Sequence, residues 1–223
     1  MRVRADRYLW NLWIASRKEL IKIIKDIWIK INGKETFKSE TKVITWDIIE
    51  FNWEKIEVKE DILILLHKPA WYVSSDIAEW AYPSYKELVK DCPYRNLVKV
   101  AWRLDVDTEW LLVLSSSWTL IHQIISPKKW KEKIYLVQLE NKITDEAIEQ
   151  LGKWVNIWDY ITLPAKVQKI DDKQIYLTIT EGKFHQIKKM AHSVGNQVVY
   201  LKRIKVWDYE LWDLKLGQWK YLD

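Results

Sequence analysis

Glycine is scarce in this sequence, with five residues in a chain of 223. An ordinary protein of this length contains about 7% glycine, or roughly 15 residues. Glycine is the residue that most readily adopts the positive φ angles of tight turns and helix ends. Such turns are therefore either few here or built from other residues.

Tryptophan is abundant, with sixteen residues, and it occupies places where turn glycines are expected. Five tryptophans stand beside Asp or Asn between strand-like segments: Trp46, Trp53, Trp158, Trp207 and Trp212. A left-handed conformation costs a residue other than glycine about 1–2 kcal/mol, so about a dozen of them would exceed a usual stability of about 5–15 kcal/mol. We hypothesise that most of these tryptophans are glycines in the living protein, encoded by UGA codons that the organism reads as glycine.

The alternative explanation is a tryptophan-rich surface that binds carbohydrate or lies at a membrane interface. It is disfavoured because the tryptophans follow turns and do not line one face of an element. Trp219 comes just after Gly217 in the sequence, and we expect it to be a genuine tryptophan. UGG codons at all sixteen positions would contradict the hypothesis.

Other absences narrow the class of protein. The single cysteine, Cys92, cannot form an internal disulfide or, by itself, a structural zinc site. No segment approaches the ~18–20 uncharged apolar residues of a membrane span, and the first ten residues lack the apolar core of a signal peptide. The four histidines show no metal-ligand spacing, and no phosphate-binding loop ends in Gly-Lys-Ser/Thr. We expect a cytoplasmic protein without a metal or other cofactor.

Positive charge is concentrated near the N-terminus, although the net charge of the whole chain is only +5. Residues 1–34 contain nine Lys or Arg side chains against Asp6, Glu19 and Asp26. Such a basic segment favours a polyanionic partner. The side chains predicted to contact the phosphates of such a partner are Arg4, Arg17, Lys18, Lys22, Lys25 and Lys30. A charged face that is merely solvated is the alternative.

The spacing of apolar residues predicts a small domain over residues 1–58. The apolar stripe of Tyr8, Leu9, Leu12 and Ile14 predicts one short helix, and a second is expected after Ser16, which is suited to cap it. A hairpin should turn at Asn32 and Gly33, and alternating strands should continue to about Val58. Residues 58–61 are the predicted linker.

The pattern over residues 62–223 predicts an α+β domain with a mostly antiparallel mixed sheet. Strands are expected over residues 62–68, 110–115, 132–140, 165–170, 174–180 and 197–206. Helices are expected over residues 84–89, 119–125, 144–153 and 184–194.

Several motifs in order resemble the pseudouridine synthases that modify ribosomal RNA and carry an N-terminal ribosomal S-four-type RNA-binding domain. They are "SRKELIKIIKD", "IKINGK", "LHKPAWYVSS", "RLDVDTEWLLVL", "EKIYLV", "EGKFHQIKKM" and "GNQVVYLKRIKVW". The resemblance covers nearly the whole chain. The family pattern has glycine where this sequence has Trp71, Trp102, Trp110 and Trp118, which agrees with the recoding hypothesis.

The resemblance implies an enzyme that detaches uracil from its ribose, rotates it and reattaches it through carbon, without a cofactor. By this resemblance Asp105 is the catalytic carboxylate, and Lys188 is the cation that keeps it ionised. Tyr135 matches the active-site tyrosine that stacks on uracil and moves a proton. Arg103 is expected to help hold the target nucleotide out of its helix, with phosphate binding as the alternative.

The sequence gives lesser roles to residues near these four. Asp107 is interpreted as a structural loop residue. His185 and Gln186 are expected to position RNA or fix a loop, outside the catalytic set. Lys68 and Pro69 match family scaffold near the site.

Within the family, "EGKFHQIKKM" resembles the enzymes that act on small-subunit ribosomal RNA. Large-subunit ribosomal RNA and transfer RNA are the alternative substrates, and a noncatalytic RNA-binding or ribosome-assembly factor is the alternative function. The partner is expected to be ribosomal RNA or an assembly intermediate, and the protein is expected to be a monomer with no membrane association.

Overall fold

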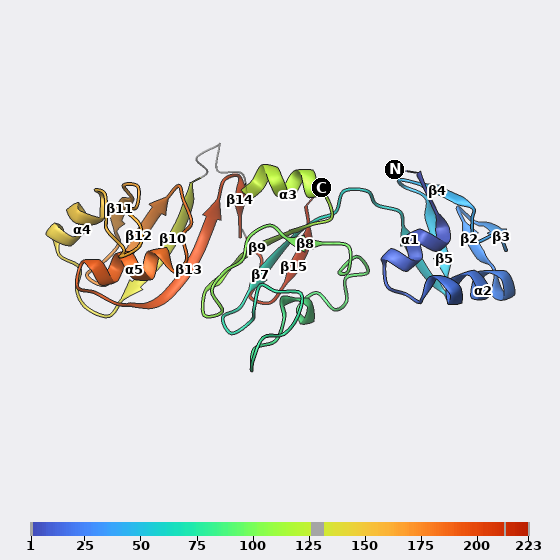
Figure 1. The fold of residues 1–223 in the computed structure, drawn as a ribbon, viewed down its shortest axis with the longest axis horizontal. Helices are drawn as coiled ribbons and strands as arrows, with labels where there is room; N and C mark the ends of the chain where they lie inside the picture. Colours follow the sequence, from blue (N-terminus) through green and yellow to red (C-terminus); the bar gives the residue numbers. More distant parts are fainter. Residues whose placement is uncertain (1, 126–131, 212, 223) are drawn as a thin grey trace.

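The computed structural model describes residues 2–125, 132–211 and 213–222. Within them the chain forms an α+β structure in which strands outnumber helices (Figure 1), as the sequence pattern predicts. Two tryptophans covered by the recoding hypothesis, Trp130 and Trp212, lie outside the described residues.

The N-terminal part consists of two helices and six short strands, drawn in blue in Figure 1. A four-stranded sheet has the order β3-β2-β5-β6, and β1 pairs separately with β4. Apolar side chains of both helices share one core with this sheet, among them Leu9, Leu20 and Ile49. The elements are β1 (Arg2–Arg4), α1 (Ala5–Asn11), α2 (Arg17–Ile27), β2 (Ile29–Ile31), β3 (Lys34–Thr36), β4 (Lys42–Ile44), β5 (Ile48–Phe51) and β6 (Glu54–Glu57).

Local signals in the sequence determine where these elements begin and turn. The Ser16 Oγ accepts a hydrogen bond from the Glu19 backbone N–H, and the Glu19 carboxylate accepts one from the Ser16 N–H. This reciprocal capping box starts α2 at the predicted place. Asn32 and Gly33 form the predicted two-residue turn between β2 and β3.

The rest of the chain forms one nine-stranded sheet. Seven strands follow the order β11-β12-β10-β13-β9-β7-β15, with β14 beside β13 and β8 beside β9. Among the described strands the pairing of β9 with β13 is parallel and all others are antiparallel. The strands are β7 (Leu63–Lys68), β8 (Lys99–Val100), β9 (Glu109–Ser115), β10 (Lys133–Leu139), β11 (Lys166–Lys169), β12 (Gln174–Ile179), β13 (Val198–Val206), β14 (Tyr209–Glu210) and β15 (Trp219–Tyr221).

Helices α3 (Trp118–Ile125), α4 (Asp145–Leu151) and α5 (Gln186–Ser193) accompany this sheet. In Figure 1, α4 and α5 lie beside β10–β13, at the end of the molecule opposite the N-terminal part. The helix predicted over residues 84–89 is wrong, because the structure has only a 3₁₀ turn, η1 (Tyr85–Glu87). The Leu88 N–H donates to the carbonyl of Tyr85, three residues back, which is the 3₁₀ pattern, and the Tyr85 hydroxyl donates to the Asp76 carboxylate at 2.7 Å.

Residues 58–62 connect β6 to β7 without helix or strand. Val58 is buried in the same apolar cluster as the N-terminal helices, and the Lys59 N–H donates to the Tyr8 hydroxyl. The division into domains at 1–58 and 62–223 stays a prediction.

Candidate active site

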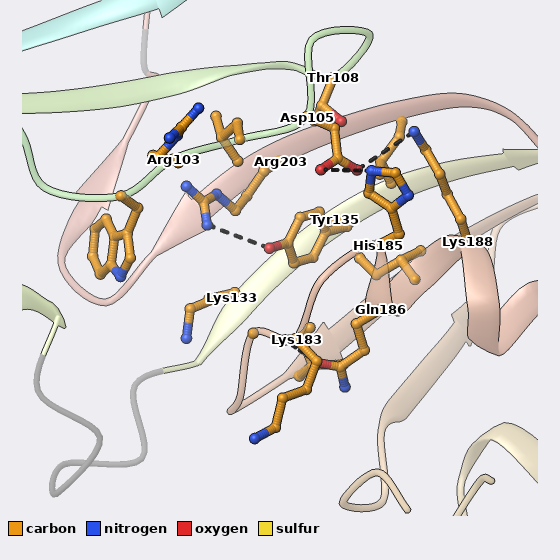
Figure 2. A pocket seen from close by; sticks show the side chains of 16 residues that line it. Arg103, Asp105, Thr108, Lys133, Tyr135, Lys183, His185, Gln186, Lys188 and Arg203 are labelled. Atoms are coloured by element: carbon orange, nitrogen blue, oxygen red, sulfur yellow. Dashed lines mark hydrogen bonds and ion pairs between the residues drawn. The ribbon is translucent and has the colours of Figure 1, made fainter. Parts of the chain in front are cut away.

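A cavity of about 120 Å³ lies where the loop before β9 meets β10, β13 and the start of α5. Figure 2 shows the side chains that line it, including Asp105, Tyr135 and Lys188. The three residues predicted to be catalytic are therefore brought together from three separate segments of the chain. Arg103 lines the same cavity.

The loop that contains Asp105 is held from several sides by hydrogen bonds. The Ser74 hydroxyl accepts from the Leu104 N–H, and the Thr108 N–H donates to the Asp105 carbonyl. The Val106 carbonyl accepts from the Trp71 N–H at 2.7 Å and from the Lys68 ammonium at 3.4 Å. This loop therefore has a fixed shape before any substrate binds.

Lys68 is fully buried at the end of β7, and its ammonium also donates to the carbonyls of Pro69 and Tyr72. Burial lowers the pKa of Lys68 to about 8, although the negative charges of Asp107, Asp105 and Glu109 act to raise it. Its three donors match three backbone acceptors. Lys68 thus links the end of β7 to the loop of Asp105, which gives the scaffold role expected from the sequence a structural basis.

Two nitrogen groups from the α5 region approach the Asp105 carboxylate, whose side chain is about a quarter exposed. The His185 Nε2 lies 3.4 Å from one oxygen, and the Lys188 Nζ lies 3.4 Å from the other (Figure 2). The Lys188 ammonium makes shorter contacts, both 2.7 Å, with the two oxygens of Asp107. Asp107 therefore fixes the position of Lys188, in addition to being a loop residue.

The turn before α5 positions these two groups. The buried Gln186 side chain accepts from the Lys183 N–H and donates to the Glu181 carboxylate. Glu181 also accepts from the Leu163 N–H, so the turn is tied to a second segment. His185 precedes the helix with a left-handed φ of 52°, which directs its ring toward Asp105.

A tyrosine and an arginine form another part of the lining. The Arg203 Nη1 donates to the Tyr135 hydroxyl at 3.3 Å, and both side chains are buried. Burial lowers the pKa of the Arg203 guanidinium, and the Tyr135 hydroxyl partly counteracts this. An arginine stays charged at neutral pH even after such a shift. The cavity therefore presents a phenol supported by a fixed positive charge.

Sequence reasoning did not select Arg203, although an arginine inside the apolar strand sequence "VVYLKRIKV" was an available signal. It also placed His185 outside the catalytic set, whereas the structure brings its ring to the Asp105 carboxylate. Arg103 lies at the exposed side of the lining, and its Nη2 is 3.0 Å from a Glu79 oxygen. Lys133 and Lys183 add further positive charge to the lining.

Apart from Arg103, the basic residues predicted to bind RNA lie in the N-terminal part, away from this cavity. Lys18, Lys22 and Lys25 are exposed and follow one face of α2. Arg4 makes a two-point hydrogen bond to the buried Asp6, and Arg17 lies 3.7 Å from the same carboxylate. The Lys30 Nζ lies 3.8 Å from the Glu35 Oε1. The α2 lysines are thus the members most available to a phosphate backbone.

The cavity combines a partly exposed carboxylate, adjacent cationic or hydrogen-bonding nitrogen groups, and a phenol. Such a site can stabilise or trap an electron-poor carbon and move a proton. Within the described residues, no group of three or more His, Cys, Asp or Glu side chains is placed to hold a metal ion. No helix in the described parts of the chain has the length and apolar character needed to cross a membrane.

Comparison with known proteins identifies a family of similar enzymes. Residues 62–193 match the family described as RNA pseudouridylate synthase. Ribosomal small subunit pseudouridine synthase A of Vibrio parahaemolyticus is 32% identical, over 99% of this chain and 96% of the relative. Ribosomal large subunit pseudouridine synthase B of Bacillus subtilis is 29% identical, over 90% of this chain and 84% of the relative.

A solved structure gives the same result for the fold. A crystal structure of a pseudouridylate synthase superposes with a TM-score of 0.69 at 31% identity, and the match covers 99% of this chain and 96% of that chain. The mixed sheet and its helices thus form the pseudouridine synthase fold, and the chain belongs to the RNA pseudouridylate synthase family.

Proposed function

We propose that this enzyme isomerises a specific uridine in small-subunit ribosomal RNA, with Asp105 as the catalytic carboxylate. The observation that carries the proposal is the placement of Asp105 at the cavity, 3.4 Å from both His185 and Lys188 and close to Tyr135. The small-subunit relative matches almost the whole chain, which supports this class of RNA as the substrate.

The reaction breaks the bond between the uracil nitrogen and the ribose and forms a bond from a uracil carbon to the same ribose carbon. The carbon that attacks loses a proton, and the released nitrogen gains one, so the reaction is an isomerisation. Asp105 acts at this ribose carbon in the interval between the breaking of its bond to nitrogen and the formation of its bond to the uracil carbon. Tyr135, which lines the cavity, contacts the base and moves the proton.

The charged neighbours of Asp105 support its role. A carboxylate taken out of water needs nearby positive charge or hydrogen-bond donors to remain ionised. Lys188 supplies the charge and is held by Asp107, and His185 supplies a nitrogen on the other oxygen. The buried Arg203 provides a fixed cation behind Tyr135.

The N-terminal part is proposed to act as an S-four-type RNA-binding domain. Exposed lysines on α2 favour contacts with phosphates, which provide affinity and salt dependence but little choice of sequence. Selection of the uridine is then left to the cavity and its surroundings, where Arg103 helps to keep the nucleotide out of its helix.

Mapping pseudouridine by carbodiimide modification and reverse transcription tests the proposal. The protein and its Asp105→Asn variant are each incubated with small-subunit ribosomal RNA transcript. We expect one new reverse-transcription stop that requires intact Asp105. A protein with glycine in place of the turn tryptophans is assayed in parallel, so that a folding defect is not mistaken for a missing activity.

Large-subunit ribosomal RNA and transfer RNA transcripts serve as comparison substrates. A stop only in one of these would move the target to that RNA and leave the catalytic assignment intact. Binding of all three RNAs without a stop in any would favour a noncatalytic assembly factor.

A further inference from the structure

We propose that eight tryptophan positions in this chain are occupied by glycine in the functional protein. All eight have a positive φ, between 50° and 77°. They are Trp13, Trp28, Trp46, Trp53, Trp71, Trp80, Trp158 and Trp207. Among the described residues only three other non-glycine residues share this property, namely Asn32, Asn52 and His185. A large aromatic side chain is a rare occupant of this region, whereas asparagine and glycine are common there.

Two hairpins of the same form give an internal comparison. Between β2 and β3 the turn residues are Asn32 and Gly33, with φ of 51° and 79°. Between β5 and β6 they are Asn52 and Trp53, with φ of 50° and 67°. A two-residue hairpin with two positive φ angles strongly prefers Asn followed by Gly. Trp53 stands where Gly33 stands in the equivalent turn.

The end of α1 requires glycine for a second reason. The Trp13 N–H donates to the Trp10 carbonyl, and the Ile14 N–H donates to the Leu9 carbonyl. With the C-cap at Leu12, these two bonds form the helix-ending motif whose left-handed residue is usually glycine. That residue is Trp13, with φ of 63°.

Trp28 gives the most restrictive backbone of the set. It ends α2 with φ of 75° and ψ of 163°. This region of backbone space is essentially limited to glycine. Asparagine, which tolerates the ordinary left-handed region, does not fit this position either.

Two further turns show the same preference. The Asp47 N–H donates to the Ile44 carbonyl, so Trp46 is the third residue of a turn, with φ of 77°. A turn with positive φ at this place is of type II and takes glycine there. Trp207 is the first of two residues between β13 and β14, where hairpin turns of types I′ and II′ both need a positive φ.

Three of these side chains contribute little packing, whereas others such as Trp71 and Trp158 lie against Tyr82 and His192. Trp53 is 95% exposed, Trp13 is 78% exposed and Trp80 is completely exposed. Trp219 differs in each respect, because it lies in β15, packs against the apolar cluster and donates from Nε1 to Asp91 at 3.0 Å. The structure therefore sets these eight positive-φ positions apart from Trp219, which lies in a strand and whose indole nitrogen has a hydrogen-bond partner.

The combined strain of eight such residues is comparable to the whole stability of a domain. Translation of UGA as glycine in the cell explains the pattern, because reading the gene with a code that assigns UGA to tryptophan would insert the same error at each position. The first test is therefore peptide mass analysis of the protein from its own cells, together with its codons. We expect glycine masses and UGA at the eight positions, and a tryptophan mass and UGG at Trp219. Tryptophan masses at the eight positions would overturn the proposal.

A second test measures folding and does not depend on the RNA substrate. Trp53→Gly and Trp219→Gly are each compared by denaturant unfolding with the protein that carries all sixteen tryptophans. We expect Trp53→Gly to lower the unfolding equilibrium constant about tenfold, whereas Trp219→Gly raises it. The variant with glycine at all eight positions should unfold at a much higher denaturant concentration than the protein with all sixteen tryptophans. An equal or lower midpoint for the eight-position variant would contradict the proposal, whatever the enzyme modifies.

Discussion

Asp105 and Asp107 are two residues apart in one loop, but their side chains have different surroundings and different expected roles. Asp105 lines the cavity, whereas Asp107 takes both short contacts from Lys188. We expect Asp105→Asn to lower single-turnover rates about 10⁴-fold or more, as removal of a catalytic nucleophile does in other enzymes. Asp107→Asn is the matched control and should lower the rate about a hundredfold or less, through misplacement of Lys188. Equal losses would contradict the division of roles.

Lys188 supplies positive charge near Asp105, so its charge and its reach can be tested separately. Lys188→Met removes the charge and should lower the single-turnover rate, because the Asp105 carboxylate then lacks the ammonium that lies 3.4 Å away. Lys188→Arg keeps the charge and should lower the rate less, although the geometry of its side chain differs. Single-turnover rates of the two variants are the measurement, and an equal loss in both would be evidence against the role of the charge.

Lys68 makes a prediction about stability against pH. Its pKa is about 8 in the folded chain and 10.5 when unperturbed. Between these pH values the unfolded chain binds more protons than the folded chain, so the contribution of Lys68 to the free energy of unfolding rises with pH. Lys68→Met should lack this rise, although it is less stable because three carbonyls lose their donor. Denaturant unfolding at pH 7.5 to 10 checks the prediction, and parallel curves for the two proteins would refute it.

The catalytic candidates could be selected from the sequence because they lie in motifs with several recognisable residues. The sequence could not show which carboxylate Lys188 contacts most closely, since that depends on the angle between α5 and the loop. Arg203 was missed because an arginine in a strand usually reaches solvent. Its burial follows from the pairing of β13 between β10 and β9, which is a property of the folded sheet.

Helix α2 shows how a few polar atoms define the beginning of an element. The Ser16 side chain accepts from the Glu19 N–H in the capping box. Ser16→Ala should lower the free energy of unfolding by about 1 kcal/mol. Glu19→Gln keeps a side chain that can accept from the Ser16 N–H and should cost less. Thermal unfolding of both variants checks this, and an equal loss would argue against the reciprocal cap.

The strands of the large sheet were predictable because long apolar and alternating runs dominate their sequences. Their order was not, because it depends on pairings between distant segments. The helix expected over residues 84–89 failed for a local reason, since a six-residue apolar pattern cannot distinguish an α-helix from a turn. Turns were predictable because tight turns need residues that tolerate a positive φ. The same rule shows that tryptophan is out of place at the eight turn positions.

Across the whole molecule, the basic face of α2 and the cavity occupy different parts of the structure. Neutralising Lys18, Lys22 and Lys25 as glutamines should weaken RNA binding. The slope of log affinity against log salt should become shallower by about 0.7–0.9 for each phosphate that is no longer neutralised. The same change at Lys142, Lys169 and Lys173, near β11 and β12 at the opposite end, is the charge-matched control (Figure 1). Equal slopes for the two triple variants would show that α2 does not direct binding.

The central place of β13 in the sheet has a consequence for synthesis of the protein. Strands β9 and β10 are separated in the sheet by β13, which comes near the end of the chain. Pairing of such distant segments is slow, because a long loop must close first. On the ribosome, the basic N-terminal part emerges before β13 has been translated. The lysines of α2 are therefore exposed to RNA early, whereas Asp105, Tyr135 and Arg203 meet only after β13 has been made.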